Sequence, residues 1–412
     1  MDKDNTKTTI NELLKIINEQ TFTKLINVIE LDKYVKKLTA HKFLQLLIIA
    51  HINEVDSLAH LTQKVKDDYK LNRHMGFDIS TSQLSRKLGA LSPKVFEKVF
   101  HHLVFNIHAR QKGQPISQQI SRLHVIDSTT MSMSLTQYPW ATFRKTKAGV
   151  RLHLQVVVTK DMVLPDSGVL TPAKHADRTQ MNELIEIVPD AVYLFDRGYN
   201  DYKQFDKLCM KKVRFITRLK KNAEVKVLQE YEANPDSLIF KDQKVILGKG
   251  KNQMTRSLRL IETEDSEGNT VIIITNCFHL SANEIGDLYR YRWKIETFFK
   301  WMKQHLHLKT FYGKSENAVY NQIWIALITY CLELLMQRNL HHKGSLLDVH
   351  RKLQTNLFEG LDKFIRSLFR KPERTSKGRR ANRWEREFKF IERQFVLEEV
   401  SHLNDLTFDP LF

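Results

Sequence analysis

The stretch of residues 123–219 constrains the fold most, because its apolar residues form short continuous or alternating runs instead of recurring at helical spacing. Two parts of it, residues 177–188 and 202–210, return to helical spacing. The stretch therefore predicts three strands, a helix, a strand, a helix and a strand. In chain order these segments are residues 123–126, 150–159, 162–170, 177–188, 191–195, 202–210 and 213–219.

Two aspartates stand at matching places in this pattern. Asp127 follows the first predicted strand and Asp196 follows the fourth. An antiparallel meander followed by β-α-β crossovers is the plan of a ribonuclease-H-like domain, in which the first and fourth strands lie side by side. We therefore expect an α/β core of this class, a mixed five-stranded sheet with helices, with both aspartates at the ends of neighbouring strands.

A later stretch, residues 288–306, predicts a helix that carries one more acid. Tyr289, Glu296 and Lys303 are seven residues apart, and Arg292 lies between the first two on the same stripe. Ser281 is the expected N-cap of this helix. The alternative is a solvated face whose Arg292–Glu296 pair contributes only about 0.3–0.5 kcal/mol.

Asp127, Asp196 and Glu296 are expected to converge if the helix packs across the sheet. Three carboxylates without His or Cys form a hard oxygen site suited to Mg²⁺ or Mn²⁺. Two such ions can activate the attacking oxygen and stabilise the leaving oxygen in phosphodiester chemistry. For each aspartate alone, a strand-end turn or a helix cap is the simpler interpretation.

The pattern Tyr-x2-Arg-x3-Glu-x6-Lys over residues 289–303, with HVIDST around Asp127 and YLFDRGYND around Asp196, resembles the DDE transposases of bacterial insertion sequences, specifically family four. The resemblance covers about residues 120–340. It implies a ribonuclease-H-like core with a β-rich insertion before the catalytic glutamate. It also implies that the three acids are catalytic and hold two Mg²⁺ or Mn²⁺ ions.

The resemblance assigns DNA contacts as well. Tyr289, Arg292 and Lys303 would contact phosphates beside the cleaved end. The family's reaction is cleavage at the ends of the element, followed by attack of the freed 3′-hydroxyls on target DNA. Some relatives pass through a DNA hairpin with the help of an insertion aromatic, but the insertion here has no Trp, so the sequence leaves that step open.

Further candidates come from the residues themselves. Arg197 lies beside Asp196, and Lys145 and Lys147 belong to a basic loop cluster with Arg144; all are candidates for phosphate contacts. Gly198 is expected to permit a tight turn. Two polar residues near the sheet edge are expected to support or cap the site without binding metal, namely His175 and Asp177.

Charge and composition favour a nucleic-acid partner. Lys plus Arg outnumber Asp plus Glu by 65 to 47, which gives a net charge of +18. The apolar run of residues 323–336 contains polar residues and is too short for a membrane span, so we expect a buried helix and no membrane partner. The three cysteines show no metal-ligand spacing and fit a reducing cytosol. A bacterial cytoplasmic, nucleoid-associated protein that dimerises on double-stranded DNA is expected.

Five regions are predicted along the chain. They are a helical DNA-binding domain (residues 1–112), the first part of the core (118–221), a β-rich insertion (222–276), the second part of the core (277–343) and a basic helical region (344–412). In the first region, one helix is expected to start after Ser80 or Thr81 and a second to have Pro93 in its first turn. The first of these helices either exposes Ser82, Gln83, Ser85, Arg86 and Lys87 to a DNA groove or is an ordinary small-residue helix of a bundle, and the sequence leaves both interpretations open. A basic loop of the insertion would contact a phosphate backbone through Lys249, Lys251 and Arg256.

Two other functions remain open from the sequence. A ribonuclease-H-like endonuclease or junction resolvase would cut DNA without joining it. A DNA-binding protein with vestigial acids would do neither, but the presence of all three acids argues against it.

Overall fold

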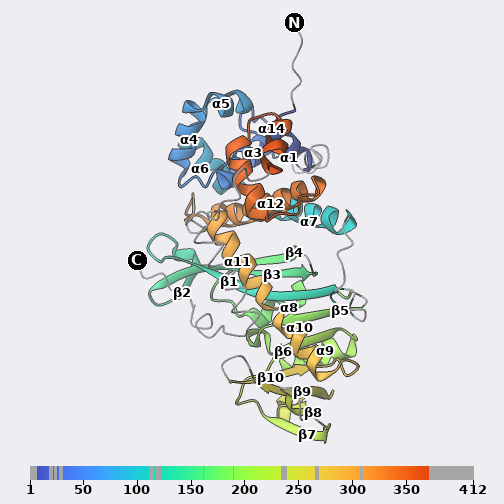
Figure 1. The fold of residues 1–412 in the computed structure, drawn as a ribbon. Helices are drawn as coiled ribbons and strands as arrows, with labels where there is room; N and C mark the ends of the chain where they lie inside the picture. Colours follow the sequence, from blue (N-terminus) through green and yellow to red (C-terminus); the bar gives the residue numbers. More distant parts are fainter. Residues whose placement is uncertain are drawn as a thin grey trace. The chain divides into compact units, whose positions relative to one another are not determined.

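The computed structural model shows two compact units (Figure 1). The structure describes residues 7–370 except 18–21, 23–25, 27–30, 111–115, 117–119, 121, 161, 189, 233–238, 265–268, 307 and 309. Within these residues, the first unit contains the chain up to residue 110, residues 127–176 and residues 294–370. The second unit contains residues 116–126 and 177–293.

The first unit is built around one long helix, α12, at Glu316–Asn339. By length and composition it is the one helix in the described part of the chain that could cross a membrane, but 94% of its apolar window is buried inside the protein. Helices α7, α3 and α6 pack on it, as expected of a core helix. The prediction of a buried helix at this position is confirmed. The other helices of this unit are α1 (Thr9–Lys15), α3 (Ala40–Ile52), α4 (Leu58–Asp67), α5 (Tyr69–Met75), α6 (Thr81–Ala90), α7 (Pro93–Arg110), α11 (Trp293–His305), α13 (Leu346–Asn356) and α14 (Leu361–Leu368).

Helix α6 begins after Ser80, where the sequence predicts. The Ser80 hydroxyl accepts a hydrogen bond from the Gln83 amide, and the Gln83 side-chain oxygen accepts one from the Ser80 amide, which completes a capping box. The C-terminal end of α6 is fixed to α12, because the Asn321 side-chain amide donates to the carbonyls of Leu88 and Leu91 at 2.9 Å each. Pro93 is the first residue of α7, where its missing amide proton costs no hydrogen bond.

The strands of the first unit form a meander. Strand β3 (Lys147–Val158) pairs antiparallel with β4 (Val163–Pro172), with Val158 opposite Val163. The short strand β2 (Thr142–Arg144) and strand β1 (Arg122–Ser134) are the neighbours of β3 in the sheet order. The predicted hairpin of residues 150–170 is therefore confirmed.

The second unit contains the parallel part of the sheet. The first five residues of β1 pair parallel with β5 (Ala191–Phe195), and β5 pairs parallel with β6 (Arg214–Arg218). Antiparallel neighbours then follow in the order β10, β9, β8 and β7. Their bounds are Thr270–Thr275, Leu258–Glu264, Ile239–Leu247 and Val225–Glu230, and the helices of this unit are α8 (Met181–Leu184), α9 (Tyr202–Met210) and α10 (Ala282–Arg290).

This order confirms that the first and fourth predicted strands are neighbours. It also confirms a β-rich segment between residues 222 and 276, and it adds that this segment continues the sheet, because β10 pairs with β6.

The helix predicted for residues 177–188 is wrong in its extent. A 3₁₀ turn, Asp177–Gln180, precedes the four-residue helix α8, so Asp177 is not an α-helical N-cap. The chain leaves helical geometry at Ile185, whose φ of −90° and ψ of 107° are extended. Ile185, Ile187 and Val188 are β-branched and Pro189 follows in the sequence, and both features disfavour a helix there.

Helices α13 and α14 agree with the predicted helical character after residue 344. Most cations of the predicted basic region lie outside the residues that the structure describes. They are Lys371, Arg374, Lys377, Arg379, Arg380, Arg383 and Arg386.

Candidate active site

Strands β1 and β5 lead to the two predicted aspartates. In their parallel register, Ile126 is the partner of Phe195, and each aspartate is the next residue of its chain segment. Asp196 directly follows β5, as predicted. Asp127 does not end its strand, because β1 continues to Ser134. The continuation contains Thr129 and Thr130, whose β-branched side chains favour extended backbone.

The Asp196 carboxylate is not used to cap the 3₁₀ turn that follows it, Arg197–Tyr199. The tight turn expected at Gly198 is present, but Gly198 does not have a positive φ, so the turn does not depend on the left-handed conformation that glycine allows. It supplies space instead: a Cβ at Gly198 would lie 3.2 Å from Oδ2 of Asp177 and 3.8 Å from Oδ2 of Asp196. The carboxylates of Asp177 and Asp196 therefore face the same small volume above Gly198. The neighbouring Arg197 is exposed.

Asp127 is half-buried within β1, and its Oδ1 accepts a hydrogen bond from the amide of Ser128 at 2.7 Å. An amide proton stabilises the charged form of a carboxylate.

The predicted single helix of residues 288–306 is wrong. Helix α10 ends at Arg290 and α11 begins at Trp293, with a turn between them. The amides of Tyr291 and Arg292 bond to carbonyls three residues earlier, which tightens the chain and ends α10. Ser281 is an N-cap as expected, with a capping box to Glu284, but the helix that it caps is α10.

This break separates the four signature residues. Tyr289 is 9% exposed in α10, and the Arg292 guanidinium in the turn lies 6.0 Å from the centre of its ring. Glu296 and Lys303 lie in α11, where their seven-residue spacing does place them on one side. The stripe that the sequence predicts therefore exists only for Glu296 and Lys303. Glu296 stands in the first turn of α11, where the helix dipole favours a negative charge.

Two lysines attach α11 to strands of its own unit. Lys303 Nζ donates to the Thr130 carbonyl of β1 at 3.2 Å, and Lys294 Nζ donates to the Thr159 carbonyl just after β3 at 3.4 Å. Glu296 lies between these two attachments along the helix, and Figure 1 shows α11 running across β1 and β3. Burial, which penalises the charged ammonium group, lowers the pKa of Lys303.

A second cation, Arg151, also forms a hydrogen bond with Thr130. Arg151 Nε donates to Thr130 Oγ1 at 3.2 Å, and its guanidinium carbon lies 5.9 Å from the centre of the Phe143 ring. Arg144 stacks over the same ring at 4.9 Å. Lys145, in the turn between β2 and β3, is exposed, and Lys147, the first residue of β3, is half-buried. The predicted basic loop is therefore a basic surface with an aromatic centre in the first unit.

Helix α6 exposes most of the face that was predicted. Ser82, Gln83, Ser85 and Arg86 are exposed. Lys87 is not part of this face, because it forms an ion pair with Asp32 at 2.9 Å and is only 14% exposed.

The C-terminal half of α11 rests on a buried pair of ionisable side chains, Glu333 and His350. His350 Nδ1 lies 2.8 Å from the Glu333 carboxylate, and both side chains are at most 1% exposed. His350 also stacks edge-on against Trp301 of α11 at 5.9 Å. Although burial opposes a charge on the imidazole, the carboxylates of Glu333 and Glu54 raise the pKa of His350. Sequence reasoning missed this support, since the pair joins residues on different helices.

Within the part of the chain that the structure describes, no group of three His, Cys, Asp or Glu side chains is arranged to hold a metal ion. The donor types at Asp127, Asp196 and Glu296 fit Mg²⁺ or Mn²⁺, since all are carboxylates. Cys209, Cys277 and Cys331 are all free thiols.

Comparison with known proteins identifies the family. The model of the transposase DDE domain matches residues 119–332, which include both core strands and α11. The chain belongs to the DDE transposase family. A domain of unknown function matches residues 5–78.

Individual relatives agree with this placement. A probable transposase for insertion sequence element IS5377 from Geobacillus stearothermophilus is 32% identical over 60% of this chain and 62% of its own length. A putative transposase, y4zB, from Sinorhizobium fredii is 32% identical over 51% of this chain and 59% of its own length. A putative transposase for insertion sequence element IS4SA from Synechocystis is 26% identical over 63% of this chain and 74% of its own length. The chain thus matches about 60% of the length of the first two relatives.

Proposed function

We propose that this DDE transposase acts for a bacterial insertion sequence, binds the element's terminal inverted repeats, cleaves the ends and joins them to target DNA. The observation that carries the proposal is the register of β1 and β5. In this register Ile126 is the partner of Phe195, so Asp127 and Asp196 are the next residues on two neighbouring strands. A ribonuclease-H-like core requires this arrangement. The relatives that are named as transposases of insertion sequences support the choice of reaction.

In this proposal, Asp127, Asp196 and Glu296 hold two Mg²⁺ or Mn²⁺ ions. When bound, such ions activate the attacking oxygen and stabilise the leaving oxygen. Asp127 is suited to the role because the Ser128 amide favours its charged form. Gly198 leaves open the space that the Asp196 carboxylate faces.

The chain's cations would position the DNA. Lys303 is held at Thr130 by its own hydrogen bond, so it presents a nearly fixed positive charge beside β1. Arg292, Arg197, Lys145 and Lys147 would contact further phosphates of the DNA. Tyr289 would act through the Arg292 guanidinium that lies against its ring.

The reaction begins when water attacks the phosphorus at the element end, which breaks the bond to the 3′ oxygen and leaves a 3′-hydroxyl and a 5′-phosphate. That hydroxyl then attacks a target phosphorus, and the target's own 3′ oxygen leaves. The second step exchanges one phosphodiester bond for another, so no energy source is required. A homodimer that holds both ends, acting on bacterial chromosomal DNA in the cytoplasm, completes the proposal.

The test uses single substitutions of the three acids. We expect Asp127→Ala, Asp196→Ala and Glu296→Ala each to abolish Mg²⁺-dependent cleavage of end DNA and to leave end binding largely intact, measured by gel assays on the full chain. Asp190→Asn is the matched control, because Asp190 lies at the opposite end of β5 and pairs with Arg214 at 3.6 Å. Cleavage that survives in any of the three variants would contradict the catalytic assignment.

An endonuclease or resolvase without joining activity is the alternative. The wild-type protein distinguishes the two when it is given a labelled, precut end and a second duplex. Covalent joining of the label to the second duplex supports a transposase, and cutting alone supports the alternative.

A further inference from the structure

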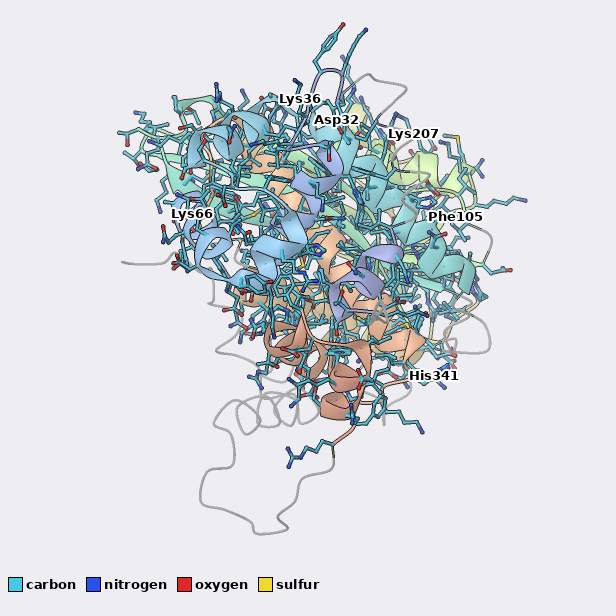
Figure 2. All side chains as sticks on the ribbon, turned by 90° about the horizontal axis from the view of Figure 1, so that it is seen from above. Asp32, Lys36, Lys66, Phe105, Lys207 and His341 are labelled. Carbon is cyan, nitrogen blue, oxygen red and sulfur yellow. The ribbon has the colours of Figure 1, made fainter. Side chains whose placement is uncertain are left out.

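Helix α9 of the second unit carries a row of lysines that the proposed chemistry does not use. Lys203 and Lys207 lie in α9 and Lys211 is its C-cap; the three are spaced four residues apart, so they follow one another along a single side of the helix. All three are exposed, and Lys207 is labelled in Figure 2. Like charges at this spacing repel one another, so the row is unfavourable until an anion lies over it.

A basic loop lies against the neighbouring side of the same helix. The Asp206 carboxylate accepts hydrogen bonds from the amides of Thr255 at 2.9 Å and Arg256 at 2.9 Å. At the other end of the loop, a Cβ on Gly248 would lie 3.0 Å from the Tyr202 ring. The loop of residues 248–257 therefore follows the stripe of Tyr202 and Asp206, directly beside the lysine row.

The sharp start of this loop depends on glycine. Gly248 has a φ of +81°, which other residues rarely adopt, and a Cβ there would lie only 2.4 Å from the Asn252 carbonyl oxygen. The loop is thus held at both ends, and its three cations have a defined place on the surface.

Together the helix and the loop form what we call the α9 patch, which consists of Lys203, Lys207, Lys211, Lys249, Lys251 and Arg256. All six side chains are exposed, and none of them forms an ion pair with another residue in the described part of the chain. One acid near the patch, Asp206, is occupied by the loop amides. Another, Glu224, is exposed and acts together with burial to raise the pKa of Tyr202.

Stabilisation of the helix dipole accounts for part of this pattern, because Lys207 and Lys211 lie at the C-terminal end of α9. It does not account for the three cations of the loop, which lie outside α9. Six cations without acid partners on one surface fit a polyanion.

We propose that the α9 patch binds the phosphate backbone of the target duplex, the DNA into which the element ends are joined. This inference rests on the proposed transposase function. Lysines are mobile point charges that contact phosphates without reading bases, which suits a target of variable sequence. Recognition of the element's own ends needs base contacts, for which a row of lysines is poorly suited.

The experiment uses full-length protein and two triple variants. One is Lys203→Gln/Lys207→Gln/Lys211→Gln and the other is Lys249→Gln/Lys251→Gln/Arg256→Gln. The matched control removes the same charge from exposed lysines of the first unit, Lys94→Gln/Lys98→Gln/Lys343→Gln. Each protein is given precut end DNA and a labelled target duplex over a range of salt concentrations, and end cleavage is measured in parallel. Thermal unfolding checks that all variants are folded.

We expect both patch variants to cleave ends like the wild type and to join them to target poorly. The slope of log target affinity against log salt should become shallower by about 0.9 for each phosphate that is no longer neutralised, so by up to about 2.7 for a triple variant. The control should keep the wild-type slope.

Two results would overturn the inference. Joining and salt slope equal to the wild type would remove the α9 patch from DNA binding. Equal losses of end binding and cleavage would show that the patch holds end DNA and not target. Failure of the transposase proposal itself would be seen separately, as absence of cleavage or joining by the wild type.

Discussion

Lys303 and Lys207 are both proposed to meet DNA, but the protein holds them in opposite ways. Lys303 is half-buried, and its ammonium group is already bonded to the Thr130 carbonyl. Lys207 is exposed on α9 and has no such partner in the described residues. The difference indicates two proposed uses of a positive charge. Lys303 would hold a phosphate at one point, and Lys207 would attract a duplex from a distance.

Elementary electrostatics gives each use its own signature. Exposed charges are screened over about 8 Å at physiological salt, so the α9 patch should lose its effect as salt rises. A hydrogen bond to a charged group in a partly dry site contributes about 1.5–3 kcal/mol and is screened much less. Salt dependence, more than affinity, therefore distinguishes the two regions.

Among the variants that test the contrast between Lys303 and Lys207, the largest expected effect comes from removing the Lys303 charge. Lys303→Met should lower the single-turnover rate of end cleavage by about 10-fold to 100-fold, because about 1.5–3 kcal/mol of charged hydrogen bonding is removed. It should change the salt slope of end binding by no more than about 0.9, the value for one phosphate. Cleavage is measured with a labelled element end at several salt concentrations.

Lys300→Met is the control for this variant, since Lys300 is exposed on the same helix. Its cleavage rate should remain close to that of the wild type. If Lys300→Met and Lys303→Met reduce cleavage equally, the hydrogen bond to Thr130 has no special role and the contrast between the two regions fails.

An intermediate effect is expected when the positive charge is kept but the ammonium group is replaced by a guanidinium group. Lys303→Arg should slow cleavage, because a planar guanidinium does not fit a half-buried place that is built for one ammonium donor. Lys207→Arg should leave target joining unchanged, because any exposed cation there can reach a phosphate. The two variants are compared in the same cleavage and joining assays, and a harmless Lys303→Arg would argue against a fixed site.

Much of the fold could be predicted because the spacing of apolar residues along the chain indicates which residues of a helix or strand are buried. The continuous apolar run of residues 191–195 corresponds to β5 residue for residue, and the apolar run of residues 323–336 lies within α12. The neighbouring position of β1 and β5 followed from chain topology alone.

The break between α10 and α11 could not be predicted, because no Gly or Pro marks it. Tyr291 and Arg292 are compatible with a helix, and the chain turns there through bonds three residues back that spacing does not reveal. The extent of β1 was missed for a related reason, since Ser128–Ser134 is polar and its strand is stabilised by pairing within the sheet.

The α9 patch shows a different limit of sequence reasoning. The basic loop was recognised from its composition, but its place beside α9 depends on hydrogen bonds from Thr255 and Arg256 to Asp206, about fifty residues earlier. Long-range pairs of this kind leave no local pattern in the sequence.

The smallest expected effect is a linkage between pH and the half-buried lysine. Burial lowers the pKa of Lys303 in the folded chain below the value of about 10.4 that an unfolded lysine has. Between the lowered pKa and that value, the unfolded chain binds more protons, so the contribution of Lys303 to stability should rise with pH. Its attraction for phosphate should fall over the same interval, because the folded ammonium group loses its proton.

The two opposite trends can be measured together. From about pH 7 to about pH 10, the thermal midpoint of the wild type should rise relative to that of Lys303→Met. Over the same range, the ratio of the wild-type cleavage rate to the Lys303→Met rate should fall. Lys300→Met again provides the comparison on the same helix. If both differences are independent of pH, Lys303 is not desolvated enough to differ from the exposed lysines of α9, and the distinction between a fixed and a mobile charge has no physical basis.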